Sequence, residues 1–549
     1  MSIRIPRHTL AAAALVVPLL ASAQPAAPRA ATRADSLSLV DALRMAMALS
    51  PSLRVARLAV DGARGDLAIA ESAFDGQVVT SAVRDQQSTL GFAPLGDAAA
   101  SSVASVLAAR QQSTSYQISL QQQLPLGMVF TPQLGLSQVG TTGSALAPTN
   151  RASAGMSLIV PLAKNRGGTL VNAARREAAD DVEASESDLR QSVAQITYQA
   201  ALAYWDYAAA GERLRVFRSS EARARMLVDE TTELVRHDAR PAADLQQVRG
   251  NLATKRAQRV GAEQALAEAR QQLGVVLGIE PNDLAALPEA SLVAPLDSAA
   301  VAAALRDSTG GRGTVPRVDA DVVLARRPDI AAAESRRRAA EIEMGASDNN
   351  MRASLDLTVG MSYAGLASGA GVDGFLSPLY RNVRGATMTV QLQYGFPLRN
   401  LAARGRAAQA TALLEQARTV ERDLARQATT ATAVAVSGVE RGGAALADAA
   451  EAVRLARLVV DNEREKFRLG VSTQIDVVLA EDGLMNALLA EIAARRTYAG
   501  AVGTLRYQTG ELASAGDDVT RLAALLRPVP NAPSVPNAPN SSAPARRDP

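Results

Sequence analysis

Few side chains in this chain of 549 residues combine in a pattern that could catalyse a reaction. There is no cysteine, which excludes thiolate catalysis, thiolate metal sites and disulfides, and the only histidines are His8 and His237. His8 lies in a segment that we expect to be removed, and one histidine cannot form a multi-histidine metal site. A Ser-His-Asp arrangement would depend on His237 alone, beside Pro241 at a predicted turn. The glycine-rich run at 310–314 (GGRGT) lacks the lysine of a phosphate-binding loop. We therefore expect no catalytic residue, no metal and no cofactor, and we interpret the chain as not an enzyme.

The charge pattern argues against a nucleic-acid partner. The first 23 residues hold two of the 58 basic residues and none of the 55 acidic ones, so the rest of the chain is almost neutral. Its acidic and basic residues are interleaved, whereas nucleic-acid binding proteins gather basic residues in a patch. The run 336–338 (RRR) is typical of a solvated helix face, although such residues can also line a tunnel.

The N-terminus has the features of a cleaved signal peptide. Arg4 and Arg7 precede an apolar stretch at 10–20, and Ala21-Ser22-Ala23 forms a small-residue cleavage site. This stretch is too short to cross a bilayer, which needs about 20 residues. The rest of the chain has no unbroken apolar run long enough for a spanning helix. The exported protein is therefore either soluble in the periplasm or crosses a membrane as a β-barrel.

Two stretches are predicted to be very long helices. Between Gly168 and Arg236 there is no proline and one glycine, Gly211, and a continuous helix of this length would measure about 100 Å at 1.5 Å per residue. Its apolar residues are spaced alternately by four and three, as in a left-handed coiled coil. A second stretch at 402–468 has the same length. The apolar seam of the first stretch is Val193, Ile196, Ala200, Ala203, Tyr207, Ala210, Leu214 and Phe217, and the glycines expected to weaken the middle of the second are Gly438, Gly442 and Gly443.

Short segments with alternating apolar and polar residues precede each long helix. The segments 117–124, 355–363 and 387–396 each have an apolar and a polar face and about nine or ten residues. One interpretation is a strand half-buried in a soluble sandwich, and the other is a transmembrane barrel strand, which has about 9–11 residues. We favour the barrel because a signal peptide and very long helices accompany these segments. The residues predicted to face lipid are Met388, Val390, Leu392 and Tyr394.

Residue types recur at a constant offset, which indicates an internal duplication. Asp244 and Gly278 recur 232 residues later as Asp476 and Gly510. A solenoid needs roughly three or more copies, so we predict two repeats of one supersecondary unit. The predicted organisation is a signal peptide at 1–23, a first repeat at 24–279 (barrel strands near 76–160, helical hairpin 164–279), a connector at 280–317, a second repeat at 318–511 (strands near 354–396, hairpin 400–511) and a C-terminal segment at 512–549 that is disordered from about 528.

Three motifs, in this order, resemble those of the TolC-type outer membrane efflux protein (outer membrane factor) family. They are the stretch 39–53 ending in Ser-Pro-Ser-Leu, the prolines that close a strand in 160–162 (VPL) and 396–398 (FPL), and the helix-tip turn at 467–479 (FRLGVSTQIDVVL). The resemblance covers nearly all of residues 36–511. It implies an α+β membrane protein in which three chains share a transmembrane β-barrel, with about four strands per chain, continuous with a long α-helical coiled-coil periplasmic tunnel.

The same resemblance implies a function and a set of partners. Such proteins are the outer membrane ducts of tripartite efflux pumps or type I secretion systems. The homotrimer, embedded in outer membrane lipid and with a large periplasmic portion, docks onto a periplasmic adaptor (membrane fusion) protein that links it to an inner-membrane transporter. Barrel geometry also requires oligomerisation, since four strands cannot close a barrel and small barrels need about eight. The competing interpretation is a periplasmic coiled-coil structural or adaptor protein without a pore.

The resemblance places the periplasmic aperture and the adaptor-docking tip in two helix-tip turns. Asp476 is either a helix N-cap alone or an N-cap that also forms a pore-lining ring. Asp238 replaces a glycine of the family pattern, while Ser472 and Leu479 replace an arginine and an acidic residue that are frequent there. The candidate tip residues are Asp238, Asp244, Phe467, Gly470, Ser472, Asp476 and Leu479.

One segment departs from the family pattern. Residues 117–139 look like an additional pair of strands, with 124–127 (LPLG) between them. This pair could lengthen the barrel hairpin or lie elsewhere in the molecule.

Overall fold

The computed structural model describes residues 37–93, 105–142, 147–237, 241–290, 320–369, 371–381 and 383–526. The predicted signal peptide at 1–23 and the C-terminal segment from about 528 lie outside these residues. The predicted connector at 280–317 is described only as far as residue 290. The domain boundaries derived from the sequence therefore stay predictions.

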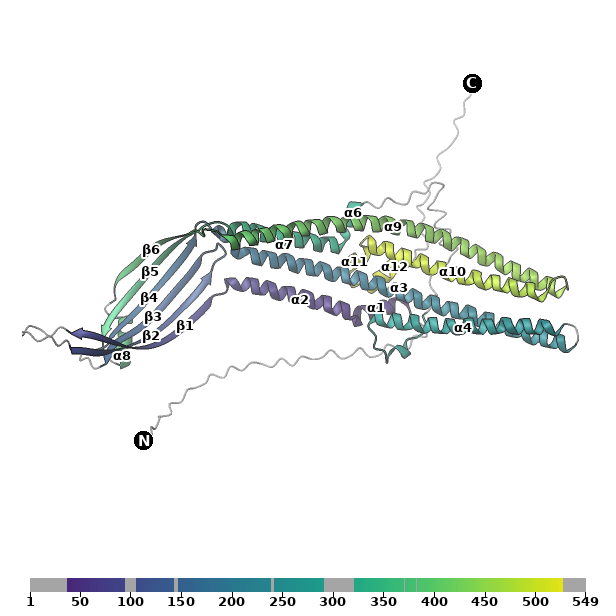
Figure 1. Cartoon of the computed structure of the whole chain (residues 1–549), viewed down its shortest axis with the longest axis horizontal. Coiled ribbons are helices and arrows are strands. Elements are labelled where there is room, and N and C mark those ends of the chain that lie inside the picture. Colours follow the sequence, from purple (N-terminus) through teal and green to yellow (C-terminus); the bar gives the residue numbers. More distant parts are fainter. Residues whose placement is uncertain are drawn as a thin grey trace, which may run out of the picture.

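The molecule is elongated, with a single-layer sheet at one end and long helices that run from it to the other end (Figure 1). The sheet has six antiparallel strands whose order in space is their order in the sequence. Their bounds are β1 Gln77–Ala93, β2 Ser105–Gln123, β3 Val129–Thr142, β4 Thr149–Pro161, β5 Ser354–Ser368 and β6 Val383–Gly395.

The helical part is built on two long hairpins, α3 with α4 and α9 with α10, with shorter helices beside them (Figure 1). No helix within the described ranges is both long and apolar enough to cross a membrane. The helix bounds are α1 Leu39–Leu49, α2 Pro51–Glu71, α3 Thr169–Arg236, α4 Ala242–Leu277, α6 Ala320–Arg326, α7 Pro328–Asn350, α8 Gly371–Leu376, α9 Leu401–Arg468, α10 Gln474–Gln508, α11 Glu511–Ser514 and α12 Val519–Leu526, and the short 3-10 turns are η1 Ser72–Phe74, η2 Arg166–Gly168, η3 Leu284–Ala286 and η4 Ser377–Leu379.

The two very long helices predicted from the sequence are present. Both α3 and α9 have 68 residues, which corresponds to about 100 Å. Contrary to the expected weakness in its middle, α9 continues without a break through Gly438, Gly442 and Gly443. Two of these glycines are covered by packing: Gly442 and Gly443 are buried, and a Cβ on Gly442 would make ordinary van der Waals contact with Tyr498 of α10, 3.5 Å from its Cα.

Each long helix begins at a left-handed residue directly after the sheet. Asn165 has φ 64° before α3, and Asn400 has φ 45° before α9. Asparagine tolerates this conformation better than most residues because its side chain forms local hydrogen bonds. The Asn165 side chain accepts a hydrogen bond from the backbone N–H of Leu170 at 2.9 Å, and the Asn400 amide donates to the carbonyl oxygen of Met351 at 3.1 Å. These two turns redirect the chain from strand to helix.

The main hydrophobic core lies around the middle of α3. It also contains side chains from α1, α4, α11 and α12. Leu43, Leu273 and Leu522 from three of these helices are fully buried. Tyr204 of α3 donates a hydrogen bond to the carbonyl oxygen of Leu37 at 3.1 Å, and burial raises the pKa of this tyrosine to about 12. The core therefore fixes the N-terminal helices to the first hairpin.

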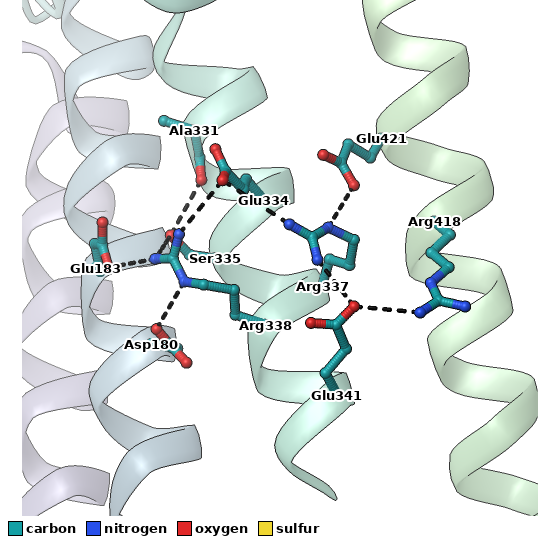
Figure 2. Close-up of polar contacts among 10 residues, drawn as sticks. All are labelled: Asp180, Glu183, Ala331, Glu334, Ser335, Arg337, Arg338, Glu341, Arg418 and Glu421. Carbon is teal, nitrogen blue, oxygen red and sulfur yellow. Dashed lines mark hydrogen bonds and ion pairs between the residues drawn. The ribbon is translucent and has the colours of Figure 1, made fainter. Parts of the chain in front are cut away.

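Charged side chains hold α7 between α3 and α9 (Figure 2). Arg337 contacts Glu421 of α9 at 2.8 Å and Glu341 of its own helix at 2.9 Å. Arg338 reaches in the other direction, to Asp180 at 3.2 Å and Glu183 at 2.5 Å, both on α3. The arginine run interpreted from the sequence as a solvated face, or as a tunnel lining, therefore bridges three helices.

The sheet corrects three expectations. It contains six strands and not about four, because the additional pair predicted near 117–139 forms β2 and β3 in the middle of the same sheet. The strands have 13 to 19 residues, more than the nine or ten predicted. The Gly-, Ser- and Ala-rich composition of segments 87–110 and 364–384 is typical of exposed loops, whereas their described residues contain strand ends and also α8. The pattern of β1 and β2 loses its alternation in their Gln- and Ser-rich stretches at 86–88 and 111–113, whereas backbone pairing continues along all of β1.

Truncation of the core at Leu273 should destabilise the protein. Leu273→Ala leaves a cavity at a fully buried position and should lower the free energy of unfolding by about 2–5 kcal/mol. Val275, two residues away on α4 and 71% exposed, provides the control, since Val275→Ala should change stability by about 0.5 kcal/mol or less. Denaturant unfolding of the detergent-solubilised protein compares the two, and equal midpoints would contradict the placement of the core.

Candidate channel wall and helix-tip aperture

One face of the sheet is apolar across neighbouring strands. In the strand register, Met388 lies opposite Met361, which lies opposite Met156, and Val390, Val359 and Leu158 form the next such row. A row of Ile118, Leu134, Ala154 and Tyr363 continues the same face over β2, β3, β4 and β5. The four residues predicted to face lipid all belong to this face and are strongly exposed, namely Met388 at 70%, Val390 at 60%, Leu392 at 62% and Tyr394 at 67%.

The opposite face is polar. A row across five strands contains Ser119, Gln133, Gly155, Ser362 and Thr387. Neighbouring glutamines on this face are linked, since Gln117 donates to Gln133 at 3.3 Å. A sheet with one apolar and one hydrated face matches the alternation of transmembrane barrel strands.

The two edge strands, β1 and β6, are open within the described part of the chain. Each pairs with one neighbour, and the described side chains of both are exposed on both faces over nearly their whole length. An exposed edge presents a row of backbone donors and acceptors to any strand that can pair with it. The described part of this chain therefore carries a sheet with two edges that are free to pair.

The second helix-tip turn, between α9 and α10, ends one helix and starts the next within five residues. Gly470 has φ 76°, and the N–H groups of Gly470 and Val471 donate to the carbonyls of Phe467 and Lys466, as in a Schellman motif. The next helix starts at Thr473, whose hydroxyl accepts from the N–H of Asp476 at 3.3 Å. Both predicted turn residues, Phe467 and Gly470, thus take part in ending α9.

Asp476 completes a capping box. Its carboxylate accepts hydrogen bonds from the N–H of Thr473 at 2.9 Å, from the Thr473 hydroxyl at 2.6 Å and from the Ser472 hydroxyl at 3.3 Å. The hydrogen bonds from Thr473 are the main reason why the pKa of Asp476 is lowered from its usual value. Both predicted alternatives made Asp476 the N-cap, whereas the N-cap residue is Thr473 and Asp476 is its capping-box partner three residues later. The pore-lining ring stays a proposal.

The first helix-tip turn joins α3 to α4. Helix α3 ends at Arg236 with His237 as its C-cap, and α4 follows Pro241. Asp238 lies outside the described residues. Asp244 lies in the first turn of α4, where a carboxylate interacts favourably with the positive end of the helix dipole.

A groove of about 310 Å³ brings the two turns together. It lies between the start of α4 and the start of α10, and its lining includes Asp244 from the first turn with Thr473 and Leu479 from the second. Leu479 is 63% exposed. Three further apolar side chains of the second turn, Leu469, Val471 and Ile475, are also exposed. The tip is thus an apolar surface with carboxylates beside it.

Sequence reasoning missed the polar contacts that join the two hairpins near the tip. Lys255 of α4, only 4% exposed, contacts Asp482 of α10 at 2.6 Å. Glu481 of α10 contacts Arg464 of α9 at 2.7 Å and Arg223 of α3 at 3.6 Å. The buried amide of Gln474 also donates to the hydroxyl of Thr231 on α3. These side chains stand in charged helical stretches with no distinguishing local motif, so the sequence carried no signal for them.

Within the described residues, no group of three or more His, Asp or Glu side chains is placed to hold a metal ion.

Several solved structures share this architecture. The outer-membrane channel OprN is 16% identical and aligns over 86% of this chain and 89% of its own with a TM-score of 0.61. The Campylobacter jejuni CmeC outer membrane channel is 14% identical over 89% of each chain with a TM-score of 0.61. The open state of the Neisseria gonorrhoeae MtrE outer membrane channel is 17% identical over 86% of this chain and 88% of its own with a TM-score of 0.58.

The chain therefore has the fold of these outer membrane channels, with long helices joined to an antiparallel sheet. This confirms, for the fold, the resemblance to the TolC-type family inferred from the sequence motifs. No protein-family profile and no curated protein matches the chain.

The capping box predicts a pH dependence at the start of α10. A carboxylate whose folded pKa is lowered stabilises the fold at pH values above its usual pKa, and this stabilisation disappears as the pH falls through the lowered value. Amide hydrogen exchange in the first turn of α10, corrected for intrinsic rates, should therefore lose protection as the pH falls below about 4, the usual pKa of an aspartate. Asp476→Asn should remove this pH dependence, and identical profiles for the two proteins would rule out the ionised cap.

Proposed function

We propose that this chain is the outer membrane duct of a tripartite efflux pump or a type I secretion system. Three copies would close one transmembrane β-barrel, and their long helices would continue it as a tunnel through the periplasm. The observation that carries the proposal is the single-layer sheet, apolar on one face and polar on the other, joined directly to helices of about 100 Å. A periplasmic coiled-coil protein without a pore would have no use for such a sheet.

Closure by several copies follows from the open edges. A lipid-exposed sheet edge leaves backbone groups without hydrogen-bond partners, at a cost of several kcal/mol for each group. The six strands run alternately away from and back toward the helices, so β6 of one copy is antiparallel to β1 of the next. Copies can therefore repeat around an axis until the wall closes.

The helix tips are the proposed aperture and docking surface. Both tip turns lie at the end of the molecule farthest from the sheet (Figure 1). A periplasmic adaptor protein would bind there and connect the duct to an inner-membrane transporter. Threefold symmetry would place three Asp476 carboxylates around the axis, where they attract cations and repel one another. The exposed Leu479 would add apolar contact to the closed state.

The two halves of the chain are proposed to be repeats of one unit. Helices α3 and α9 have the same length, and their partners α4 and α10 have 36 and 35 residues. Gly278 after α4 and Gly510 after α10 both have positive φ, 75° and 73°. The duplication would explain why one strand-to-helix plan occurs twice.

Channel activity is the direct test of the function. Purified protein reconstituted into planar bilayers should conduct ions, and light scattering should give the mass of a trimer. A well-folded monomer without conductance would refute the duct.

In the conducting protein, Asp476→Asn should weaken block by divalent or trivalent cations from the tip side about tenfold, because the carboxylate ring is lost. Asp461→Asn, at an exposed carboxylate farther along α9, is the control, and unchanged block in both variants would leave Asp476 as a cap only.

The orientation of the wall can be tested on β6. Val390→Arg should reduce trimer assembly in the membrane, since an arginine on the lipid face costs about 2–4 kcal/mol at the bilayer midplane. Gln391→Arg, on the neighbouring residue and the polar face, should assemble normally. The yield of heat-modifiable trimers in outer membrane fractions measures both variants. Equal yields would contradict the assignment of the two faces.

A further inference from the structure

We propose that β2 and β3 are wall strands, so that three copies close an eighteen-stranded barrel in place of the twelve-stranded one expected from four strands per chain. This inference rests on the proposed duct. It adds that each copy contributes six strands and that β6 of one copy pairs with β1 of the next. In β2 and β3, the side chains on the apolar face then point to lipid and those on the polar face point to the lumen.

Backbone pairing gives the first reason. β2 pairs with β1 through all 17 residues of β1, from Gln77 opposite Gln121 to Ala93 opposite Ser105. On its other side β2 pairs with β3, and β3 pairs with β4 from Val129 opposite Ile159 to Val139 opposite Thr149. Removing this hairpin from the wall would break both sets of hydrogen bonds, and β1 would have to form a new ladder with β4.

The side chains of the hairpin continue both faces of the sheet. Ile118 and Leu134 extend the apolar row that contains Ala154 and Tyr363. Gln117 and Gln133, one residue earlier on each strand, lie on the polar face. A hairpin held away from the wall would have no reason to match the apolar and polar faces of β4 and β5.

The turn between β2 and β3 is built into the junction of sheet and helices. The side chain of Asn172 on α3 donates to the carbonyl oxygen of Pro125 at 2.6 Å, and the amide of Gln122 donates to the carbonyl oxygen of Phe74 at 2.5 Å. A Cβ on Gly168 would overlap the same Pro125 oxygen, so this close approach requires glycine there. The start of α3 is therefore shaped around this turn.

The middle of β2 makes a further contact. Phe375 of α8, which belongs to the connection between β5 and β6, packs edge-on against Tyr116 of β2 with ring centroids 5.8 Å apart. This contact links the second half of the chain to β2 across the intervening strands. Side-chain contacts thus hold β2 near its turn and at its middle.

The two barrels differ clearly in width. With strands about 4.8 Å apart and tilted by about 40°, twelve strands give a backbone diameter of about 24 Å and eighteen strands about 36 Å. Eighteen-stranded barrels leave an aqueous channel after their side chains are accommodated. The six-stranded copy therefore predicts an exit about half again as wide as that of a four-stranded copy.

Cysteine labelling of the full-length chain tests this proposal, since the native sequence contains no cysteine. Single substitutions at Gln117 and Gln133 should react with a charged, membrane-impermeant maleimide roughly tenfold faster than substitutions at Ile118 and Leu134, in trimers reconstituted into liposomes. Electron cryomicroscopy of the same trimers, viewed along the axis, should show a wall about 36 Å wide.

The matched pair Val390→Cys and Gln391→Cys on β6 separates the two proposals. Faster labelling at Gln391 than at Val390 would support the duct. If labelling is then equal at all four positions of β2 and β3, or the wall is about 24 Å wide, the eighteen-stranded barrel is overturned and the duct remains intact. Equal rates at Val390 and Gln391 would refute the barrel itself and both proposals with it. Alternation on β2, β3 and β6 together with the wider wall supports the inference.

Discussion

Backbone hydrogen bonding is the constraint on which the whole molecule depends. A strand finds its partners in other strands, so a sheet that faces lipid must close on itself, whereas a helix satisfies its own backbone and can extend alone. The protein contains both kinds of element, with six paired strands at one end and helices of 68 residues beyond it. The change from one to the other occurs at Asn165 and Asn400, whose left-handed turns and side-chain hydrogen bonds redirect the chain within a few residues.

Local sequence patterns predicted the helices well and the strands less well, for physical reasons. The stretch between Gly168 and Arg236 lacks proline and has an apolar seam at helical spacing, and both features favour an uninterrupted helix. Strand number depends on partners that are distant in sequence. The distal parts of β1 and β2 carry Gln and Ser on both faces, so their alternation is weak, and only their pairing along 17 residues reveals that they are strands.

The tip shows the same division between local and long-range information. The capping box of Thr473 and Asp476 spans four residues, so the sequence was sufficient to predict a helix start here, although it gave Asp476 and not Thr473 as the N-cap. The contact of Gln474 with Thr231 joins residues 243 positions apart, and the Lys255–Asp482 pair joins different hairpins. Such contacts form only when the hairpins lie side by side, and no spacing rule along one helix anticipates them. The groove that brings Asp244 and Leu479 together has the same origin.

The position of the hydrophobic core has a mechanical consequence. The core cluster on α3 ends near Tyr207, and the helix continues to Arg236, so each hairpin projects about 45 Å beyond it as a lever arm. Along that arm, polar contacts such as Lys255–Asp482 and Gln474–Thr231 link the two hairpins. A rotation of about 10° at the core would displace the tip by about 8 Å. A small rotation at the middle of the molecule thereby produces a large displacement at its far end.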